Sequence, residues 1–587
     1  MLNVVGFEFI TNADSFIMIR LRPKVGKSKG SGFMTAQKSR ISSSCKSHQG
    51  ISLEGANGGW GACSSALDYE WTDAEWLKYR ERTVRQSDDF AYCMPLNIYR
   101  LYLGSWQTRG GRDREYLSYG EIAERLVPYI KQMGYTHVQL MGVLGIKTGV
   151  GSKASEKALY TPDPKHGSPC DLKGFVNRLH CAGIGVIAEW DIIGYVGTDG
   201  VHARSDMESV DVFGEDGRAD LLDLSREETR EYLILNAVYW LEKYHFDGLH
   251  VSSVERLLYP ELGGELDWSI ANLDSPAING CAVELFRGLN EEIRARFGDV
   301  LMIAEESTAW SRLTDSVADG GLGFSLKWNV GWTNDLFEYV QTDPIFRKYL
   351  HGKLSYSMTS AFSEKHVLPA FRADVFGEGC SLIERQFGQL EDKFKGLRVF
   401  CMYMMSHPGK KISFMGDEYG QFSHRSPDKQ LEWFMTDFDN HKSFRDFVGA
   451  LNDFYLRNDE FWADDFSWNG FRWVLADESE RNLLAFERRN RSGGRLLCVF
   501  NFSGVDVTDY LLTLPDDIPY PDVDGGARPS DTEWEVVFSS EDYMNSNAVR
   551  LIGGRLKVSL SQRSGIYLAP RRGMKAFAEI KTDCFRA

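Results

Sequence analysis

The sequence predicts an α/β fold, a (β/α)8 TIM barrel followed by a C-terminal all-β sandwich domain. Three observations predict it. The chain has 587 residues, which is too long for one ordinary domain. From residue 97 onward, short apolar runs alternate with helical patterns, as in a parallel sheet wound with helices. After about residue 470 the helical patterns give way to alternating, β-rich runs.

The N-terminal segment, residues 1–67, differs from the rest of the chain. Residues 24–61 are rich in Gly, Ser and Lys, so we expect them to be flexible or loosely packed. The apolar start contains Glu8 and Asp14, which makes it a poor signal peptide.

Eight apolar runs are expected to form the barrel strands. They are residues 97–103, 137–141, 185–190, 247–251, 301–305, 324–328, 366–370 and 411–415. Helical patterns between them include residues 119–134, 225–245 and 282–298. Eight repeated units favour a closed barrel over an open doubly wound sheet. We therefore expect the barrel to span residues 68–465 and the all-β domain residues 466–587.

Composition narrows the function classes. The chain has 83 acidic and 67 basic residues, and its net charge of −16 argues against nucleic-acid binding. Ten cysteines without a CxxC pair suggest neither a zinc site nor a disulfide framework. No run of 18 apolar residues predicts a membrane span. We expect a cytoplasmic protein that needs no metal and no cofactor, with enough aromatic residues to suit a carbohydrate-handling surface.

Several motifs together resemble one family, the bacterial 1,4-α-glucan branching enzymes of the α-amylase superfamily. They are IYRLYLGSW (98–106), AGIGVI (182–187), YHFDGLHV (244–251), IAEESTAW (303–310), GLGFSLKWNVGW (321–332) and HPGKKISFMGDEYGQF (407–422). The resemblance runs from about Tyr69 to the C-terminus and implies an α-amylase-type barrel acting on glycogen or starch-type glucan. The family usually carries an N-terminal β-sandwich of the glycogen-binding type, so residues 1–67 are expected to be a truncated or lost module.

The resemblance also locates the catalytic positions. Retaining glycosyl transfer needs a carboxylate nucleophile and a carboxylic acid about 5 Å apart. The nucleophile position is Ser252, the acid/base position is Glu305, and the position of the aspartate that grips sugar hydroxyls is Ala373. Only Glu305 is a carboxylate. Because each missing carboxylate removes several kcal/mol of transition-state stabilisation, the sequence predicts impaired catalysis.

The helper positions differ from the family as well. The family's fourth-strand arginine is His250, its two histidines are Arg372 and Gly194, and its third-strand aspartate is Glu189. The sugar-stacking tyrosine is retained as Tyr160. The residues expected to contact sugar are Tyr160, Glu189, His250, Trp310, Trp332 and Arg372, with Trp328 as a further aromatic candidate. For the tryptophans, packing in the core is the alternative.

Three alternatives concern the altered site. His250 and Ser252 share one face of a strand, which would suit a serine nucleophile and its base. Asp374 lies one residue from the Ala373 position, so on a strand its side chain would point to the other face unless the loop slips. Glu189, Asp191, Glu305, Asp374 and His250 would together suit a new acid/base site at one barrel mouth.

The predicted function is that of a catalytically impaired branching-enzyme homologue that binds α-glucan or modulates glycogen metabolism. Its expected partners are α-glucan and an active branching enzyme or glycogen synthase. The alternatives are an active branching enzyme, which the family resemblance favours, and a repurposed hydrolase or transferase using Glu305.

Overall fold

The computed structural model describes residues 4–11, 17–23, 69–85, 93–144, 160–192, 224–259, 278–308, 310–371, 381–515, 534–541, 548–549, 551–552 and 555–570. It divides into two units, Met1–Glu70 and Trp71–Ala587. In the first unit, β1 (Val4–Thr11) and β2 (Ile17–Pro23) pair antiparallel as a hairpin. The segment 24–61, for which loose packing was predicted, lies outside the described residues.

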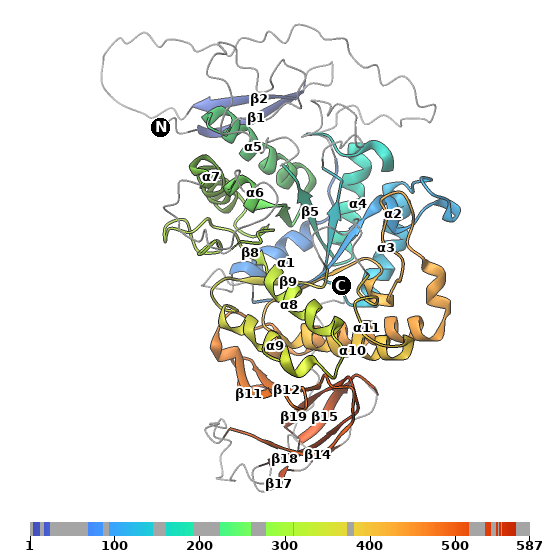
Figure 1. Ribbon diagram of the computed structural model, residues 1–587. Helices are drawn as coiled ribbons and strands as arrows, with labels where there is room; N and C mark the ends of the chain where they lie inside the picture. The colour runs from blue at the N-terminus through green and yellow to red at the C-terminus, as the bar shows by residue number, and fades with distance from the viewer. Residues whose placement is uncertain are drawn as a thin grey trace, which may run out of the picture. The chain divides into compact units, whose positions relative to one another are not determined.

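The second unit contains the predicted barrel, and the prediction of a TIM barrel is confirmed. Eight parallel strands follow one another in chain order, and the last pairs with the first to close the barrel (Figure 1). They are β3 (Asn97–Tyr102), β4 (His137–Met141), β5 (Gly185–Trp190), β6 (Gly248–Val251), β7 (Leu301–Ala304), β8 (Leu326–Trp328), β9 (His366–Pro369) and β10 (Lys410–Phe414). Almost every residue of these strands is buried, which is typical of parallel strands covered on both faces.

Helices accompany the strands. They are α1 (Ala74–Arg85), α2 (Leu103–Trp106), α3 (Tyr119–Met133), α4 (Pro169–Cys181), α5 (Glu227–Tyr244), α6 (Val254–Leu258), α7 (Gly280–Arg296), α8 (Val330–Gln341), α9 (Gly352–Tyr356), α10 (Leu390–Ser406) and α11 (Asp439–Arg457). Local sequence explains their ends. Ser118 and Ser168 each begin a helix with a capping box, and Gly134 ends α3 in the left-handed conformation.

The register of the strands determines which side chains face the barrel interior. In-register neighbours lie on the same face of a sheet, and Arg100 of β3 lies beside Gln139 of β4, while Glu189 of β5 lies beside His250 of β6. Arg100 also contacts Trp328 of β8, a strand that does not neighbour β3. These side chains therefore meet inside the barrel.

A buried charge network closes the N-terminal end of the barrel, around α1. Asp247, just before β6, is its centre. Its carboxylate accepts hydrogen bonds from four groups: Trp76 Nε1 (2.8 Å), Arg80 Nη1 (2.9 Å), His180 Nε2 (2.9 Å) and Val186 N (2.6 Å). The Nδ1 atom of His180 lies 2.9 Å from Asp73 Oδ2. Trp76 and Arg80 thus tie α1, and His180 ties α4, to the barrel strands, while Val186 links β5 to the start of β6.

The ionisation of this network follows from its contacts. Burial alone would lower the pKa of His180, but Asp247 and Asp73 raise it above its usual value. Burial raises the pKa of the Asp247 carboxyl. His180 and Arg80 outweigh this effect and lower that pKa far below its usual range. An imidazolium is therefore held between two carboxylates.

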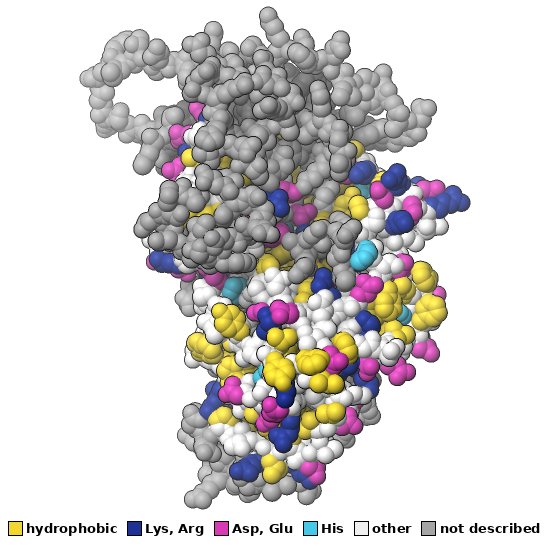
Figure 2. Space-filling view, in the orientation of Figure 1, with side chains coloured by type: hydrophobic (Ala, Val, Ile, Leu, Met, Phe, Trp, Pro, Cys, Tyr) yellow, Lys and Arg dark blue, Asp and Glu magenta, His cyan; other side chains and the backbone are white. Residues whose placement is uncertain are grey.

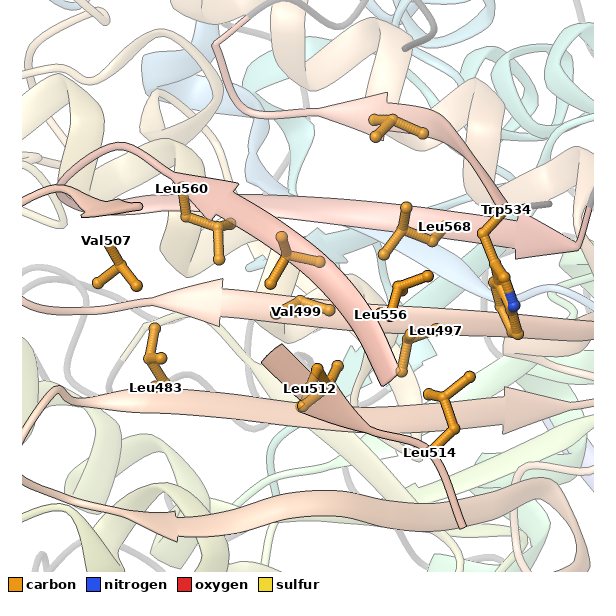
Figure 3. Close-up of a cluster of buried hydrophobic side chains, with 13 residues drawn as sticks. Leu483, Leu497, Val499, Val507, Leu512, Leu514, Trp534, Leu556, Leu560 and Leu568 are labelled. Carbon is orange, nitrogen blue, oxygen red and sulfur yellow. The ribbon is translucent and has the colours of Figure 1, made fainter. Parts of the chain in front are cut away.

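The C-terminal domain is the predicted β-sandwich. A six-stranded sheet, in the order β11-β12-β13-β19-β15-β16, faces a three-stranded sheet, β14-β18-β17. The strands are β11 (Phe471–Glu478), β12 (Leu483–Arg489), β13 (Arg495–Asn501), β14 (Val507–Thr513), β15 (Trp534–Ser539), β16 (Ala548–Val549), β17 (Leu551–Ile552), β18 (Arg555–Leu560) and β19 (Ser564–Pro570). Alternate side chains of both sheets, among them Leu497, Leu512 and Leu556, fill the core between them (Figure 3).

Buried polar contacts join this domain to the barrel. The guanidinium of Arg488 on β12 donates to the carbonyl of Ser406 at the end of α10 (2.7 Å) and pairs with Asp465 (2.9 Å). The hydroxyl of Tyr567 on β19 donates to the carbonyl of Met402 (2.5 Å). On the face drawn in Figure 2, acidic and basic side chains of the described residues are interspersed with hydrophobic ones. Among the described residues, no helix is long and apolar enough to cross a membrane.

Candidate active site

Ser252 and Glu305 lie side by side at the C-terminal ends of two neighbouring strands. β6 ends at Val251 and β7 ends at Ala304, so each residue directly follows its strand. The amide of Glu305 donates to the carbonyl of Val251 (2.9 Å), and the amide of Val254 donates to the carbonyl of Glu305 (2.8 Å). Ser253 adopts a left-handed conformation (φ 50°), which turns the chain sharply from β6 into α6. This is the end of the barrel where TIM-barrel enzymes hold their sites.

Glu189 is the meeting point of three strands. Its Oε1 atom accepts a 2.6 Å bond from Arg100 Nη2 of β3 and a 3.4 Å bond from the hydroxyl of Ser252. Arg100 is 2% exposed, whereas the side chain of Glu189 is 15% exposed. The guanidinium therefore supports the carboxylate from inside the barrel, and the carboxylate lies nearer the solvent.

His250 is buried in an aromatic environment. Its ring stacks on Trp328 with centroids 4.4 Å apart, and Arg100 Cζ lies 4.8 Å from the centroid of the same indole. Burial lowers the pKa of His250 well below its usual value, and the charge of Arg100 lowers it further. Neither ring nitrogen has a hydrogen-bond partner in the described part of the chain. His250 is thus a neutral imidazole.

Glu305 is protonated at neutral pH. Burial raises its pKa to about 8, and although Arg100 acts in the opposite sense, the charges of Glu189, Glu255 and Asp191 raise the pKa further. The Oε2 atom of Glu305 lies 3.5 Å from His250 Nε2, without the geometry of a hydrogen bond. A protonated carboxyl group is chemically able to donate a hydrogen bond or a proton.

The next residue, Glu306, has a structural role. Its Oε2 atom lies 2.5 Å from Lys327 Nζ on β8, and its Oε1 atom accepts from the amide of Thr308 (2.6 Å). The same ammonium donates to the carbonyl of Thr308 (3.1 Å). This ion pair fixes the loop after β7, and with it the position of Glu305.

The predicted sugar-contacting aromatics lie in different environments. The hydroxyl of Tyr160 donates to the carbonyl of Tyr232, and its ring packs edge-on against Tyr232 and Tyr239 of α5. Trp332 of α8 packs against Phe400 and His407, next to α10, and Trp310 packs edge-on against Tyr259. The contacts of Tyr160 and Trp332 are thus with packed elements of the scaffold, and a role of these rings in sugar binding stays a prediction.

The structure brings together Glu189, His250, Ser252 and Glu305. The remaining predicted positions, Gly194, Arg372, Ala373 and Asp374, lie outside the described residues. The contact between the hydroxyl of Ser252 and Glu189, rather than His250, gives no support to a serine–histidine nucleophile.

Arg100 was missed by the sequence analysis. The sequence did contain a signal for it: Arg100 lies in the middle of a mostly apolar predicted strand. Buried cations are rare unless they are paired, so such an arginine indicates a buried acidic partner. Among the described residues, no group of three or more His, Cys, Asp or Glu side chains suits a metal ion.

The comparisons with known proteins define the class first. A model of the α-amylase C-terminal all-β domain matches residues 473–571. In solved structures, the α-amylase of Geobacillus thermoleovorans complexed with acarbose aligns with a TM-score of 0.57 at 15% identity, covering 81% of this chain and 98% of that one. A putative α-amylase from Salmonella typhimurium aligns with a TM-score of 0.54 at 16% identity, covering 86% and 85%. The fold is that of an α-amylase.

Sequence relatives then define the family. The chain is 36% identical over 469 residues to the 1,4-alpha-glucan branching enzyme GlgB of Francisella tularensis subsp. novicida (strain U112), covering 78% of this chain and 72% of that protein. The enzyme of the same name from Francisella philomiragia is 36% identical over 462 residues, covering 77% and 71%. The chain belongs to the branching-enzyme family of the α-amylase superfamily.

Proposed function

We propose that this chain is a catalytically impaired branching-enzyme homologue that binds glycogen or starch-type α-glucan in the cytoplasm. One observation carries the proposal: the nucleophile position holds Ser252, whose hydroxyl donates to Glu189. A serine hydroxyl is a weak nucleophile without a base, and His250 does not contact it by a hydrogen bond. The Ala373 position adds a second missing carboxylate.

The retained carboxyl group is consistent with binding. Glu305 is protonated at neutral pH and therefore suits donation of a hydrogen bond to a sugar oxygen. Without an ionised carboxylate at position 252, however, it has no nucleophile to work with. A glucan-binding homologue of this kind would act by tethering or modulating an active branching enzyme or glycogen synthase.

The test pairs a binding assay with an activity assay on one preparation. Retardation of the protein in native gels containing glycogen, together with unchanged iodine staining of amylose, is the expected result. Iodine staining that falls with time in the presence of the unsubstituted protein (the parent) would instead indicate an active branching enzyme, which family membership favours. Absence of any shift with glycogen, and of any heat with maltoheptaose, would contradict the binding proposal.

A second candidate is a repurposed glycoside hydrolase or transferase that uses Glu305. It is favoured by the pKa of about 8 at Glu305, because a general acid must keep its proton at working pH. Glu189, held by Arg100, would be the corresponding ionised carboxylate. Activity on α-glucan that disappears in Glu305→Gln and persists in Ser252→Ala would support this candidate over the first.

A further inference from the structure

The barrel interior contains a guanidinium next to His250, but it comes from a different strand than the family resemblance implies. In the family the arginine occupies the position of His250 on the fourth barrel strand, β6. Here His250 and Arg100 share the indole of Trp328, with His250 stacked at 4.4 Å and Arg100 Cζ at 4.8 Å from its centroid. Arg100 belongs to the first barrel strand, β3. In this chain, therefore, the guanidinium that contacts this indole comes from β3 and not from β6.

We propose that Arg100 is a positioning residue that replaces the fourth-strand arginine and holds Glu189 as the carboxylate that accepts hydrogen bonds from glucan hydroxyl groups. This inference rests on the proposed glucan-binding function and names the residues that would carry it.

The position of Glu189 favours this role. Arg100 and Ser252 both donate their hydrogen bonds to Oε1 of Glu189. Within the described part of the chain, Oε2 is therefore left to accept from a ligand. The side chain is also more exposed than that of Arg100, which lies behind it in the barrel. A ligand arriving at the mouth would meet the carboxylate before the guanidinium.

The chemistry of a sugar hydroxyl gives the reason for needing such a carboxylate. Hydrogen bonds to an ionised acceptor are roughly twice as strong as neutral ones. The carboxylates at positions 252 and 373 are replaced by Ser and Ala. Glu305 keeps its proton at neutral pH and acts as a donor. Glu189, paired with Arg100 at 2.6 Å, supplies the missing anionic acceptor.

Calorimetry with maltoheptaose tests the proposal directly. Arg100→Met and Glu189→Gln are each expected to weaken binding about tenfold or more, since each removes or misplaces a charged acceptor. The double variant is expected to bind no more weakly than Glu189→Gln alone, because Arg100 acts through Glu189. Arg312→Met, a surface control at an exposed pair with Asp315, should bind like the parent. Parent-like binding by Arg100→Met, or additive losses in the double variant, would overturn the proposal.

A titration separates positioning from a general structural effect. Glu305 is surrounded by Arg100, Glu189, Glu255 and Asp191, and by neutral His250. Its carboxyl band in infrared spectra, assigned with Glu305→Gln, reports its protonation in the free protein. Because Arg100 lowers and Glu189 raises the pKa of Glu305, Arg100→Met should move the midpoint above pH 8 and Glu189→Gln below it. If the titration midpoint of Glu305 moved in the same direction in both variants, the charges assigned to Arg100 and Glu189 would be contradicted.

Two outcomes distinguish the failure of this inference from that of the proposed function. If the parent binds neither maltoheptaose nor glycogen, the proposed function fails, and the titration alone decides whether Arg100 and Glu189 act as an electrostatic pair on Glu305. If the parent binds and Glu189→Gln binds equally well, only the inference fails. Should Arg100→Met not fold, Arg100→Lys keeps the charge without the planar fork, and affinity between that of the parent and Glu189→Gln is expected.

Discussion

The two ends of the barrel differ in how their buried polar groups are paired. At the N-terminal end, the carboxylate of Asp247 receives four hydrogen bonds, and His180 is bonded through both ring nitrogens. At the C-terminal end, within the described residues, Arg100 Nε and Nη1 and both nitrogens of His250 have no hydrogen-bond partner. Each unpaired buried group of this kind costs about 1–3 kcal/mol.

This difference separates the scaffold from the site. At the N-terminal end, the charges of Asp247, His180 and Arg80 hold α1, α4 and the strands together. Near the C-terminal ends of β3 and β6, Arg100 and His250 keep unpaired nitrogens inside the barrel, within the described residues.

The largest expected effect comes from breaking the N-terminal network. Asp247→Asn removes the charge that pairs with His180 and Arg80 and leaves buried donors without an acceptor. We expect the free energy of unfolding to fall by about 3–5 kcal/mol, as for other broken buried ion pairs. Urea unfolding followed by tryptophan fluorescence measures it. Asp315→Asn, in an exposed pair with Arg312, is the control and should cost less than about 1 kcal/mol. A loss below that of the control would remove the contrast between the two ends.

The matching change at the mouth should have the opposite sign. At pH 7 the Glu305 carboxyl is ionised in the unfolded chain, whereas in the native state it stays protonated because its pKa is about 8. Glu305→Gln removes this cost, so we expect it to stabilise the protein by about 2–3 kcal/mol at pH 7 and by little at pH 4. Glu480→Gln, an exposed control, should leave stability unchanged at both pH values. Equal effects of Glu305→Gln at pH 4 and pH 7 would contradict the raised pKa.

A smaller effect concerns the pH dependence of the N-terminal network. Because the pKa of His180 is raised in the native state, its contribution is complete below about pH 6.5 and is lost as pH rises through the folded value. His180→Gln should therefore lower the free energy of unfolding by about 1–2 kcal/mol at pH 6. The difference from the parent should shrink as the pH is raised in a series of urea unfolding curves. A difference that grows with pH would show that His180 is neutral in the fold.

The smallest effect is expected at the former nucleophile position. Ser252→Ala removes one 3.4 Å bond to Glu189, which is near the limit of hydrogen-bond length. We expect a change in unfolding free energy of less than about 1 kcal/mol and no change in iodine staining of amylose. Ser363→Ala on the surface provides the control. Loss of a measurable branching activity in Ser252→Ala would instead assign the hydroxyl a chemical role.

The fold was predictable because periodicity and turn chemistry are local. Each barrel strand is a short apolar run, and helices such as α3 carry their own capping signals at Ser118 and Gly134. The hairpin β1–β2 was not predicted, since its segment was grouped with the Gly- and Ser-rich residues that follow it. Local patterns carry no information on which short strands pair with each other.

The site was predictable only in part. The family motifs pointed to four positions that lie close together in the structure. They are Glu189, His250, Ser252 and Glu305. The role of Arg100 depends on the register between β3 and β4 and on contacts across the barrel to Trp328, and neither can be read from one strand. The contacts of Tyr160 with α5 likewise arise from packing between distant segments.

The indole shared by His250 and Arg100 couples positions 100 and 250 of the chain. An arginine restored at position 250 alone would bring a second cation to the ring that Arg100 already covers, and like charges repel. Removing Arg100 alone would leave Glu189 without its counter-ion. His250→Arg alone, or loss of Arg100 alone, should therefore lower the melting temperature more than the double exchange Arg100→His with His250→Arg. A change at either of these two positions therefore calls for a coordinated change at the other.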